Sequence, residues 1–322
     1  MTKPGPSVQA GMQASVQTSI QKRIDRYEIV RLVHRGAMGT VYKATDTATG
    51  EVVALKVPDL SFGARPQFYD AFRREAALLK DLDHPGIVRF RGADGRDRHY
   101  LALEFLDGED LRGVFRREAP LPLSRAAEIG LALCETLAYL HGGGIAYLDL
   151  KPENVIRTVD GRFVLVDFGL ARTMGKRELV EDRAEAGLPW GTPDYASPEQ
   201  VAGKEADSRS DIYSLGIVLF EAVTGRLPFA GRTPEARARR RLRLDPIPPR
   251  AVNSGLSPAW QELILRALER EPSARFQKIE DLAQSLRDPL SIPLTSRAAR
   301  TEIPGLGETV RGWFRSLVGR SP

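Results

Sequence analysis

The sequence has few of the residues that build cross-links and metal centres. It contains one cysteine, Cys134, and four histidines among 322 residues. A single thiol cannot form an intramolecular disulfide, and it rules out a zinc site built from several cysteines. Four scattered histidines also argue against a centre that needs several imidazoles. The chain must therefore fold on its own apolar core, as expected of a protein in a reducing compartment.

Long hydrophobic runs are missing as well. No stretch reaches the about 18 uninterrupted apolar residues that indicate a membrane span. The N-terminus has no apolar segment of the kind found in signal peptides, and Thr2 does not fit the N-myristoylation pattern. These absences predict a cytoplasmic location.

The sequence has only a small excess of positive charge, and this excess lies in its two terminal segments. The net charge is +5, of which residues 1–26 contribute +3 and residues 288–322 contribute +2, so the body between them is neutral. Proteins that bind nucleic acid usually carry a basic face on the folded domain. We therefore expect no nucleic-acid partner.

The pattern of apolar residues divides the body into two parts. Strand-like alternation covers residues 27–33, 40–44 and 52–57, and helical spacing covers 67–82. Helical patterns then dominate, over 123–141, 210–224 and 258–270. This order predicts an α+β fold with a small β-rich lobe followed by a larger helical lobe.

The two ends have patterns of their own. In residues 1–26 an apolar residue recurs every four positions from Val8 to Ile24, which we interpret as a flexible or weakly helical leader. Prolines and glycines after Arg287 predict a linker, and residues 310–318 have the spacing of a short amphipathic helix. We favour docking of that helix on the body or on a partner protein over contact with a membrane surface.

The small lobe contains the first candidates for chemistry. Glycines at 36 and 39 lie between two strand-like runs, where a hairpin backbone can approach a polyphosphate closely. Lys56 ends an apolar strand and needs an anionic partner, for which Glu75 on the following helix is a candidate. Each feature alone also has a plain structural interpretation, as a hairpin turn or a strand lysine that reaches solvent.

A second group lies between a helix and a strand of the large lobe. Asp149, Lys151 and Asn154 are followed thirteen residues later by Asp167. A carboxylate beside a hydroxyl acceptor, a lysine for phosphate charge, and Asn and Asp oxygens as magnesium ligands are what phosphoryl transfer requires. The order and spacing of these four residues predict that chemistry.

With these motifs, the chain resembles the eukaryotic-like (Hanks-type) protein kinase family, and within it the bacterial serine/threonine kinases. The resemblance covers residues 27–287, with an N-lobe at about 27–104 and a C-lobe at about 107–287. It implies the two-lobed protein kinase fold, ATP with Mg²⁺, or Mn²⁺ in its place, and protein substrates with serine or threonine acceptors.

The resemblance also implies roles for individual residues. Lys56 would bind the α and β phosphates and pair with Glu75, while Asp149 would be the catalytic base and Lys151 would steady the transferred group. Asn154 and Asp167 would hold the metal. The residues expected to surround ATP are Val33, Gly36, Met38, Gly39, Val41, Ala54, Lys56, Leu103, Glu104, Leu106 and Ile156.

Residues 191–199 resemble the end of a kinase activation segment. In the family, Thr192 together with Lys151 is the pattern for serine/threonine acceptors. Glu199 would pair with Arg275, and Asp211 would anchor the catalytic loop from a central helix. Residues 237–243 hold five arginines, which we interpret as a solvated helix face rather than a dock for acidic partners.

The chain departs from the family in two places. His34 replaces the first glycine of the phosphate loop, so we expect a stiffer loop and weaker nucleotide affinity. Tyr147 and Leu148 replace a histidine and an arginine, and that arginine grips a phosphate on the activation loop in the family. Between Leu170 and Gly191 the only hydroxyl residue is Thr173. We predict a kinase that does not depend on activation-loop phosphorylation, with Tyr147 filling the space behind Phe168.

Two alternatives remain open at this point. A nucleotide-binding pseudokinase, acting as a scaffold or allosteric partner, would explain His34 and Leu148. A small-molecule phosphotransferase of related fold would share the nucleotide residues, but the activation-segment pattern argues against it. The active protein kinase is preferred because every directly catalytic position is filled.

Overall fold

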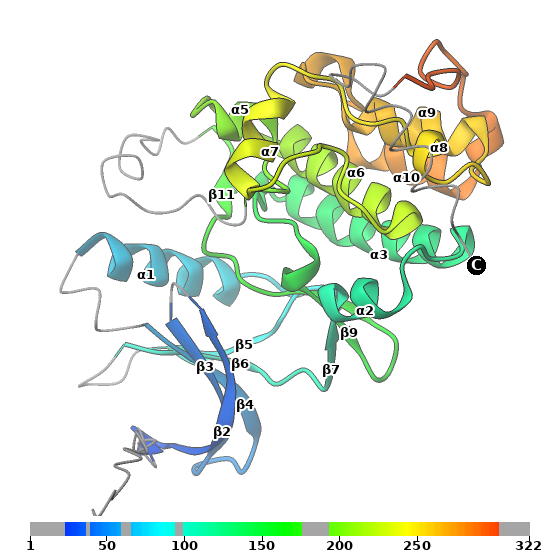
Figure 1. Ribbon diagram of the computed structural model, residues 1–322. Helices are drawn as coiled ribbons and strands as arrows, with labels where there is room; N and C mark the ends of the chain where they lie inside the picture. Colours follow the sequence, from blue (N-terminus) through cyan, green and yellow to red (C-terminus); the bar gives the residue numbers. More distant parts are fainter. Residues whose placement is uncertain (1–22, 37–38, 59–65, 94–98, 176–192, 303–322) are drawn as a thin grey trace, which may run out of the picture.

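The computed structural model describes residues 23–36, 39–58, 66–93, 99–175 and 193–302. These residues form a small lobe, built from a curled sheet and one helix, and a larger lobe that is mostly helical (Figure 1). The two-lobed architecture predicted from the sequence is confirmed.

The small lobe is a six-stranded antiparallel sheet with one helix beside it. The strands follow the order β1-β2-β3-β4-β6-β5. Their bounds are Arg23–Ile24 for β1, Tyr27–Gly36 for β2, Gly39–Asp46 for β3, Val52–Val57 for β4, Phe90–Ala93 for β5 and Leu101–Glu104 for β6, and the helix α1 covers Pro66–Lys80.

Strand β4 shows how the two faces of this sheet differ. Side chains alternate between the faces of a strand. Val53 and Leu55 lie in a small cluster that includes Tyr27 and Tyr100. Ala54 packs on the opposite face against the main core, on the side of Lys56. The sheet therefore presents Lys56 toward the large lobe.

The large lobe contains most of the helices and three short strand pairings. The helices are α2 (Leu111–Glu118), α3 (Leu123–Gly142), α5 (Pro198–Val201), α6 (Ser208–Thr224), α7 (Pro234–Arg241), α8 (Pro249–Val252), α9 (Pro258–Ala267) and α10 (Ile279–Arg287). Short 3₁₀ turns lie at Pro152–Asn154, Pro272–Ala274 and Pro289–Ser291. The strands are β7 (Gly108–Asp110), β8 (Ile145–Ala146), β9 (Val155–Thr158), β10 (Phe163–Leu165) and β11 (Arg172–Thr173), paired as β10-β9-β7 and β11-β8.

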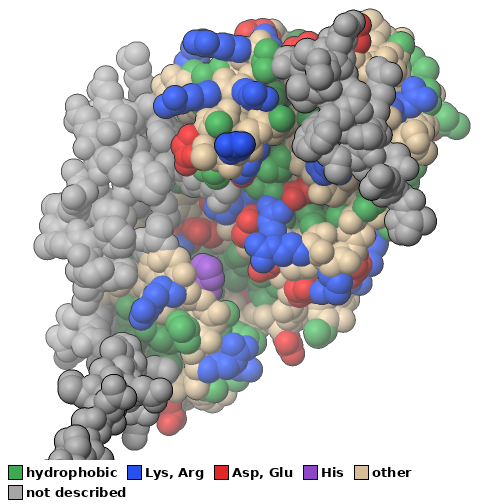
Figure 2. Space-filling model, in the orientation of Figure 1, with side chains coloured by type: hydrophobic (Ala, Val, Ile, Leu, Met, Phe, Trp, Pro, Cys, Tyr) green, Lys and Arg blue, Asp and Glu red, His purple; other side chains and the backbone are tan. Residues whose placement is uncertain are grey.

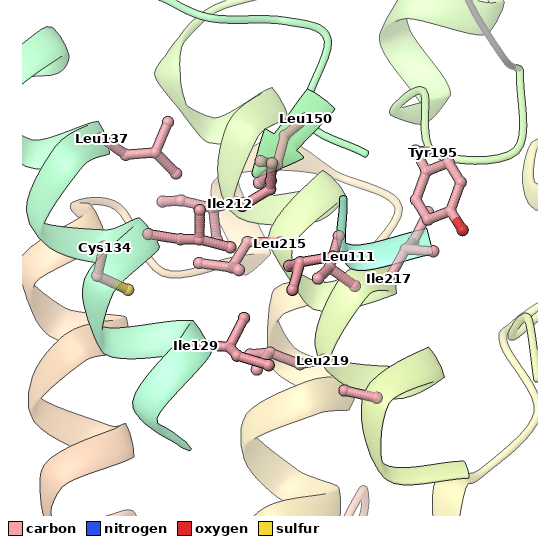
Figure 3. Packing of buried hydrophobic residues seen from close by; sticks show 14 of the residues in the cluster. Leu111, Ile129, Cys134, Leu137, Leu150, Tyr195, Ile212, Leu215, Ile217 and Leu219 are labelled. Carbon is pink, nitrogen blue, oxygen red and sulfur yellow. The ribbon is translucent and has the colours of Figure 1, made fainter. Parts of the chain in front are cut away.

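Helix α6 is the centre of the large lobe. Every residue from Ser210 to Thr224 is buried, which is why its sequence is apolar on nearly all sides. Figure 3 shows Ile129 and Leu137 of α3 packed toward Ile212, Leu215 and Leu219 of α6. The helix begins after Asp207, whose side chain accepts from the backbone N–H of Arg209, and ends at Gly225 in the left-handed conformation (φ 68°). This packing fixes the position of Asp211 on the first turn.

One hydrophobic core extends through both lobes. It includes Leu79 and Leu101 from the small lobe and Leu150 and Phe168 from the large one. The backbone joins the lobes too, since the N–H of Leu165 donates to the carbonyl of Gly86 at 2.8 Å. The elements around the interlobe region are therefore held by shared packing.

The ends of the domain differ from the sequence-based expectation. The last residues of the predicted leader form β1, and Ile24 is buried. Residues 288–302, expected to start a linker, instead lie against the large lobe, with Ile292 and Ala298 buried. We call residues 288–302 the C-terminal strap. The helix predicted over 310–318 lies outside the described residues. Within the described ranges, no helix has both the length and the apolar character to cross a bilayer.

Candidate functional site

The predicted lysine and glutamate of the small lobe meet as an ion pair. Lys56 Nζ lies 2.9 Å from Glu75 Oε1 and 2.8 Å from Oε2. Both side chains are nearly enclosed, with 12% and 3% of their surfaces exposed. Burial lowers the pKa of Lys56, but the charges of Asp167 and Glu75 outweigh it and raise that pKa overall. Lys56 is therefore a fixed cation at the edge of the interlobe region.

Asp167 joins this pair from the large lobe. Its Oδ1 lies 2.9 Å from Lys56 Nζ, and the N–H of the next residue, Phe168, donates to Glu75 Oε1 at 3.2 Å. Asp167 adopts the left-handed backbone conformation (φ 62°), which is uncommon outside glycine. Lys56 lowers the pKa of Asp167 against the effect of burial, so the carboxylate is ionised. The three charges link strand β4, helix α1 and the segment after β10.

The second predicted group is also assembled. Lys151 Nζ and Asn154 Nδ2 each lie 2.8 Å from Asp149 Oδ2. Burial raises the pKa of Asp149 to about 6, although Lys151 opposes this shift. A carboxylate with that pKa is mostly ionised at neutral pH and can accept a proton. Figure 2 shows the recess between the small lobe below and the helical lobe above, with charged side chains of both signs around it.

The loop that carries Asp149 is held by its backbone at Leu148. The N–H groups of Tyr147 and Leu148 donate to the two carboxylate oxygens of Asp211, at 2.9 and 2.7 Å. Gln200 Nε2 donates to the carbonyl of Leu148 at 2.9 Å. Leu148 itself has φ 64°, a strained value for this residue type. Asp211 and Gln200 thus anchor the backbone of the residues that precede Asp149.

Tyr147 takes the place predicted for it. Its ring packs edge-on against Phe168, with the centroids 5.1 Å apart, and its hydroxyl donates to the carbonyl of Val166. The side chain is fully buried. An aromatic ring with a satisfied hydroxyl therefore fills the space behind Phe168.

The predicted metal ligands lie at the same end of one hairpin. Asn154 directly precedes β9 and Asp167 follows β10, while the N–H of Val166 donates to the carbonyl of Asn154 at 3.0 Å. Because the Asn154 Nδ2 donates to Asp149, its amide oxygen is the atom left for a cation. Within the described part of the chain, no three His, Cys, Asp or Glu side chains form a metal cluster. One carboxylate and one amide fit Mg²⁺, which takes few protein ligands and completes its shell with phosphate oxygens and water.

Most of the residues predicted to surround a nucleotide lie on the sheet of the small lobe. Val41 pairs with Lys56, and Ala54 pairs with Leu103 on the neighbouring strand. A Cβ at Gly39 would collide with the carbonyl oxygen of Val57, so this position requires glycine. The remaining predicted residues lie at the end of β2 (Val33 and Gly36), on and after β6 (Glu104 and Leu106) and on β9 (Ile156). Met38 lies outside the described residues.

The predicted ion pair at the end of the activation segment is present and buried. Arg275 donates to both carboxylate oxygens of Glu199, at 2.8 and 2.7 Å, and none of its side chain is exposed. Ser210 Oγ donates to the same carboxylate at 2.5 Å. Arg275 lowers the pKa of Glu199, which burial alone would raise. Thr192, the predicted acceptor-specificity residue, lies outside the described residues.

The arginine-rich run is only partly the solvated face that we expected. Arg239 and Arg240 are exposed, but Arg241 is buried and donates to the backbone carbonyls of Asp194 and Ala196. Arg237 donates two hydrogen bonds of 2.6 Å to the Asp194 carboxylate. Helix α7 therefore holds the end of the activation segment, which the charge pattern alone could not reveal.

Gln200 is the positioning residue that sequence reasoning missed. Ser197 and Gln200 have the spacing of a capping box, and both bonds of that box are formed. The pattern could have predicted the start of α5. It could not predict the additional bond from Gln200 to Leu148, because that bond joins residues 52 positions apart.

Comparisons with known proteins agree with this geometry. The protein kinase domain family matches residues 27–287. A probable serine/threonine-protein kinase of Corynebacterium efficiens is 37% identical over 297 residues, which cover 89% of this chain and 44% of the relative. The serine/threonine-protein kinase PknB of Mycobacterium tuberculosis is 36% identical over 267 residues, covering 81% and 42%. The chain thus spans about two fifths of the length of these relatives.

A solved structure of a kinase domain is also similar to this chain. The crystal structure of the Mycobacterium tuberculosis PknI kinase domain, a double mutant, aligns with a TM-score of 0.64 and 26% identity, covering 82% of this chain and 95% of that one. The matched range contains both clusters of charged residues described above. This chain belongs to the protein kinase family, among the bacterial serine/threonine kinases.

Proposed function

We propose that this chain transfers the γ-phosphate of ATP to serine and threonine hydroxyls of proteins. The observation that carries the proposal is the Lys56, Glu75 and Asp167 triad, with Nζ to carboxylate distances of 2.8 to 2.9 Å. A cation fixed beside two carboxylates, at the glycine hairpin, suits a bound triphosphate with its metal.

Each residue of the site has a part in this reaction. Lys56 binds the α and β phosphates, and Asn154 and Asp167 hold Mg²⁺ or Mn²⁺, which when bound neutralises phosphate charge. Asp149 accepts the proton of the attacking hydroxyl as that oxygen bonds to the γ-phosphorus and the bond to the ADP oxygen breaks. Lys151 offsets the charge of the transferred group. The residues thus act by position and charge.

We also propose that this activity needs no phosphate on the activation segment. Leu148 cannot bind a phosphate, and its backbone is tied instead to Asp211 and Gln200. The triad of Lys56, Glu75 and Asp167 between the lobes is present in the same structure. These contacts support a catalytic loop that is held by residues of the chain itself.

A pseudokinase is the less favoured alternative. It would be expected to lose at least one of the residues that touch nucleotide, metal or acceptor. Lys56, Asp149, Asn154 and Asp167 all retain their side chains and their mutual contacts. The departures at His34 and Leu148 leave these contacts intact.

Transfer from labelled ATP and magnesium to a generic basic acceptor protein tests the proposal. Asp149→Asn keeps the size of the side chain but removes the proton acceptor, so we expect transfer to fall by about 10²-fold or more while ATP still protects the variant against thermal unfolding. Equal transfer by the variant and the wild type would contradict the role of Asp149. ATP-dependent stabilisation without transfer in the wild type would support the pseudokinase.

A further inference from the structure

His34 lies on the sheet face that carries Lys56. In the strand register, His34 is opposite Val41, and Val41 is opposite Lys56 on the next strand. Residues opposite each other in a sheet have their side chains on the same face. Strand β2 has a bulge of one extra residue between Leu32 and His34. Because of this bulge, His34 is the residue opposite Val41.

That face is the one directed at the interlobe region. Lys56 contacts Glu75 and Asp167 from it. The neighbouring residue Arg35 pairs with Thr40, which pairs with Val57 on the face of the small cluster. His34 is exposed, so its imidazole is accessible to a ligand.

The His34 side chain also lies close to Gly36. A Cβ placed on Gly36 would lie 3.1 Å from His34 Nε2, so the ring covers the backbone of that glycine. The glycines at 36 and 39 are the ones expected to approach the phosphates. The imidazole therefore lies over Gly36, on the sheet face that carries Lys56.

We propose that His34 is a nucleotide ligand whose imidazole N–H donates to a phosphate oxygen of ATP. The inference rests on the proposed function, since it names a further contact to the same nucleotide. It reverses the expectation that replacing glycine at this position weakens binding: a ring nitrogen supplies a donor that glycine lacks. Hydrogen bonds to charged groups are the stronger ones.

Calorimetric titration of adenosine, ADP and ATP, each with and without magnesium, tests this contact without relying on turnover. The variants are His34→Gly, which restores the common family residue, and His34→Gln, which keeps an N–H donor. Arg35→Ala is the matched control, because it removes a cation one residue away on the opposite face. Thermal unfolding of each nucleotide-free protein checks that the fold is retained.

We expect His34→Gly to weaken ADP and ATP binding by about tenfold and to leave adenosine binding unchanged, with His34→Gln in between. Arg35→Ala should bind all three as the wild type does. Unchanged or tighter ATP binding by His34→Gly would overturn the proposal, as would an equal loss for adenosine or for Arg35→Ala. A wild type that binds none of these nucleotides would overturn both this proposal and the proposed function.

Discussion

The backbone of Leu148 is one point at which the loop before Asp149 is held. Its backbone N–H and carbonyl are both bonded, to Asp211 and to Gln200, while its apolar side chain offers nothing to a phosphate. His141 Nε2 lies 2.9 Å from the same Asp211 carboxylate. The backbone of the position before Asp149 is thus bonded to two residues of the large lobe.

Gln200 allows a direct test of this arrangement. Gln200→Glu keeps the oxygen that accepts from Ser197 but replaces the amide group that donates to Leu148. Since losing this part-buried hydrogen bond costs about 0.5 to 1.5 kcal/mol, we expect kcat to fall by up to about tenfold with the dissociation constant for ATP unchanged. Steady-state kinetics and nucleotide titration measure the two quantities. A folded variant with wild-type kcat would contradict a positioning role for Gln200.

The C-terminal strap is the element that most extends the domain. The buried carboxylate of Glu262 on α9 accepts from the N–H groups of Thr295 and Ala298, at 3.0 and 3.1 Å. Neighbouring Gln261 donates to the carbonyl of Arg297 at 2.8 Å. The strap therefore supplies hydrogen-bond partners to the buried side chains of Gln261 and Glu262. Burying these polar groups without partners would cost free energy.

Removing the strap should destabilise the domain. A chain ending at Arg287 loses the burial of Ile292 and leaves Glu262 without these partners, so we expect its free energy of unfolding to fall by about 3 to 5 kcal/mol. A chain ending at Glu302 keeps the strap and is the control, so it should be more stable than the chain ending at Arg287. Urea unfolding followed by circular dichroism measures the difference. Equal stability of the two shortened chains would show that the strap contributes nothing.

The elements themselves were readable from the sequence to different degrees. Helix α6 and strand β4 follow from local patterns, and the Lys56 and Asp149 motifs were located by spacing. The contacts of Arg241 and of the strap could not be predicted. A buried arginine that binds carbonyls looks like a surface charge in sequence, and prolines after Arg287 indicate a linker whether or not it docks. The positions of Arg241 and of the strap depend on contacts between residues far apart in the sequence, which a local pattern does not contain.

At the scale of the whole molecule, the two lobes share one core and one triad of charges. Phe168 shows the coupling, since it packs on Tyr147 while its N–H donates to Glu75. Core side chains from both lobes surround this point. The arrangement that brings Lys56 to Asp167 is therefore supported by packing within the domain. On this packing rests our proposal that the activity needs no phosphate on the activation segment.

The most direct test of this account is the rate of transfer from labelled ATP before and after phosphatase treatment. Thr173→Ala accompanies the wild type, because Thr173 is the only hydroxyl residue between Leu170 and Gly191. Mass spectrometry of the segment confirms that no phosphate remains. We predict equal rates for treated, untreated and variant proteins. A rate that falls with the loss of phosphate from this segment and returns on its rephosphorylation would contradict the account.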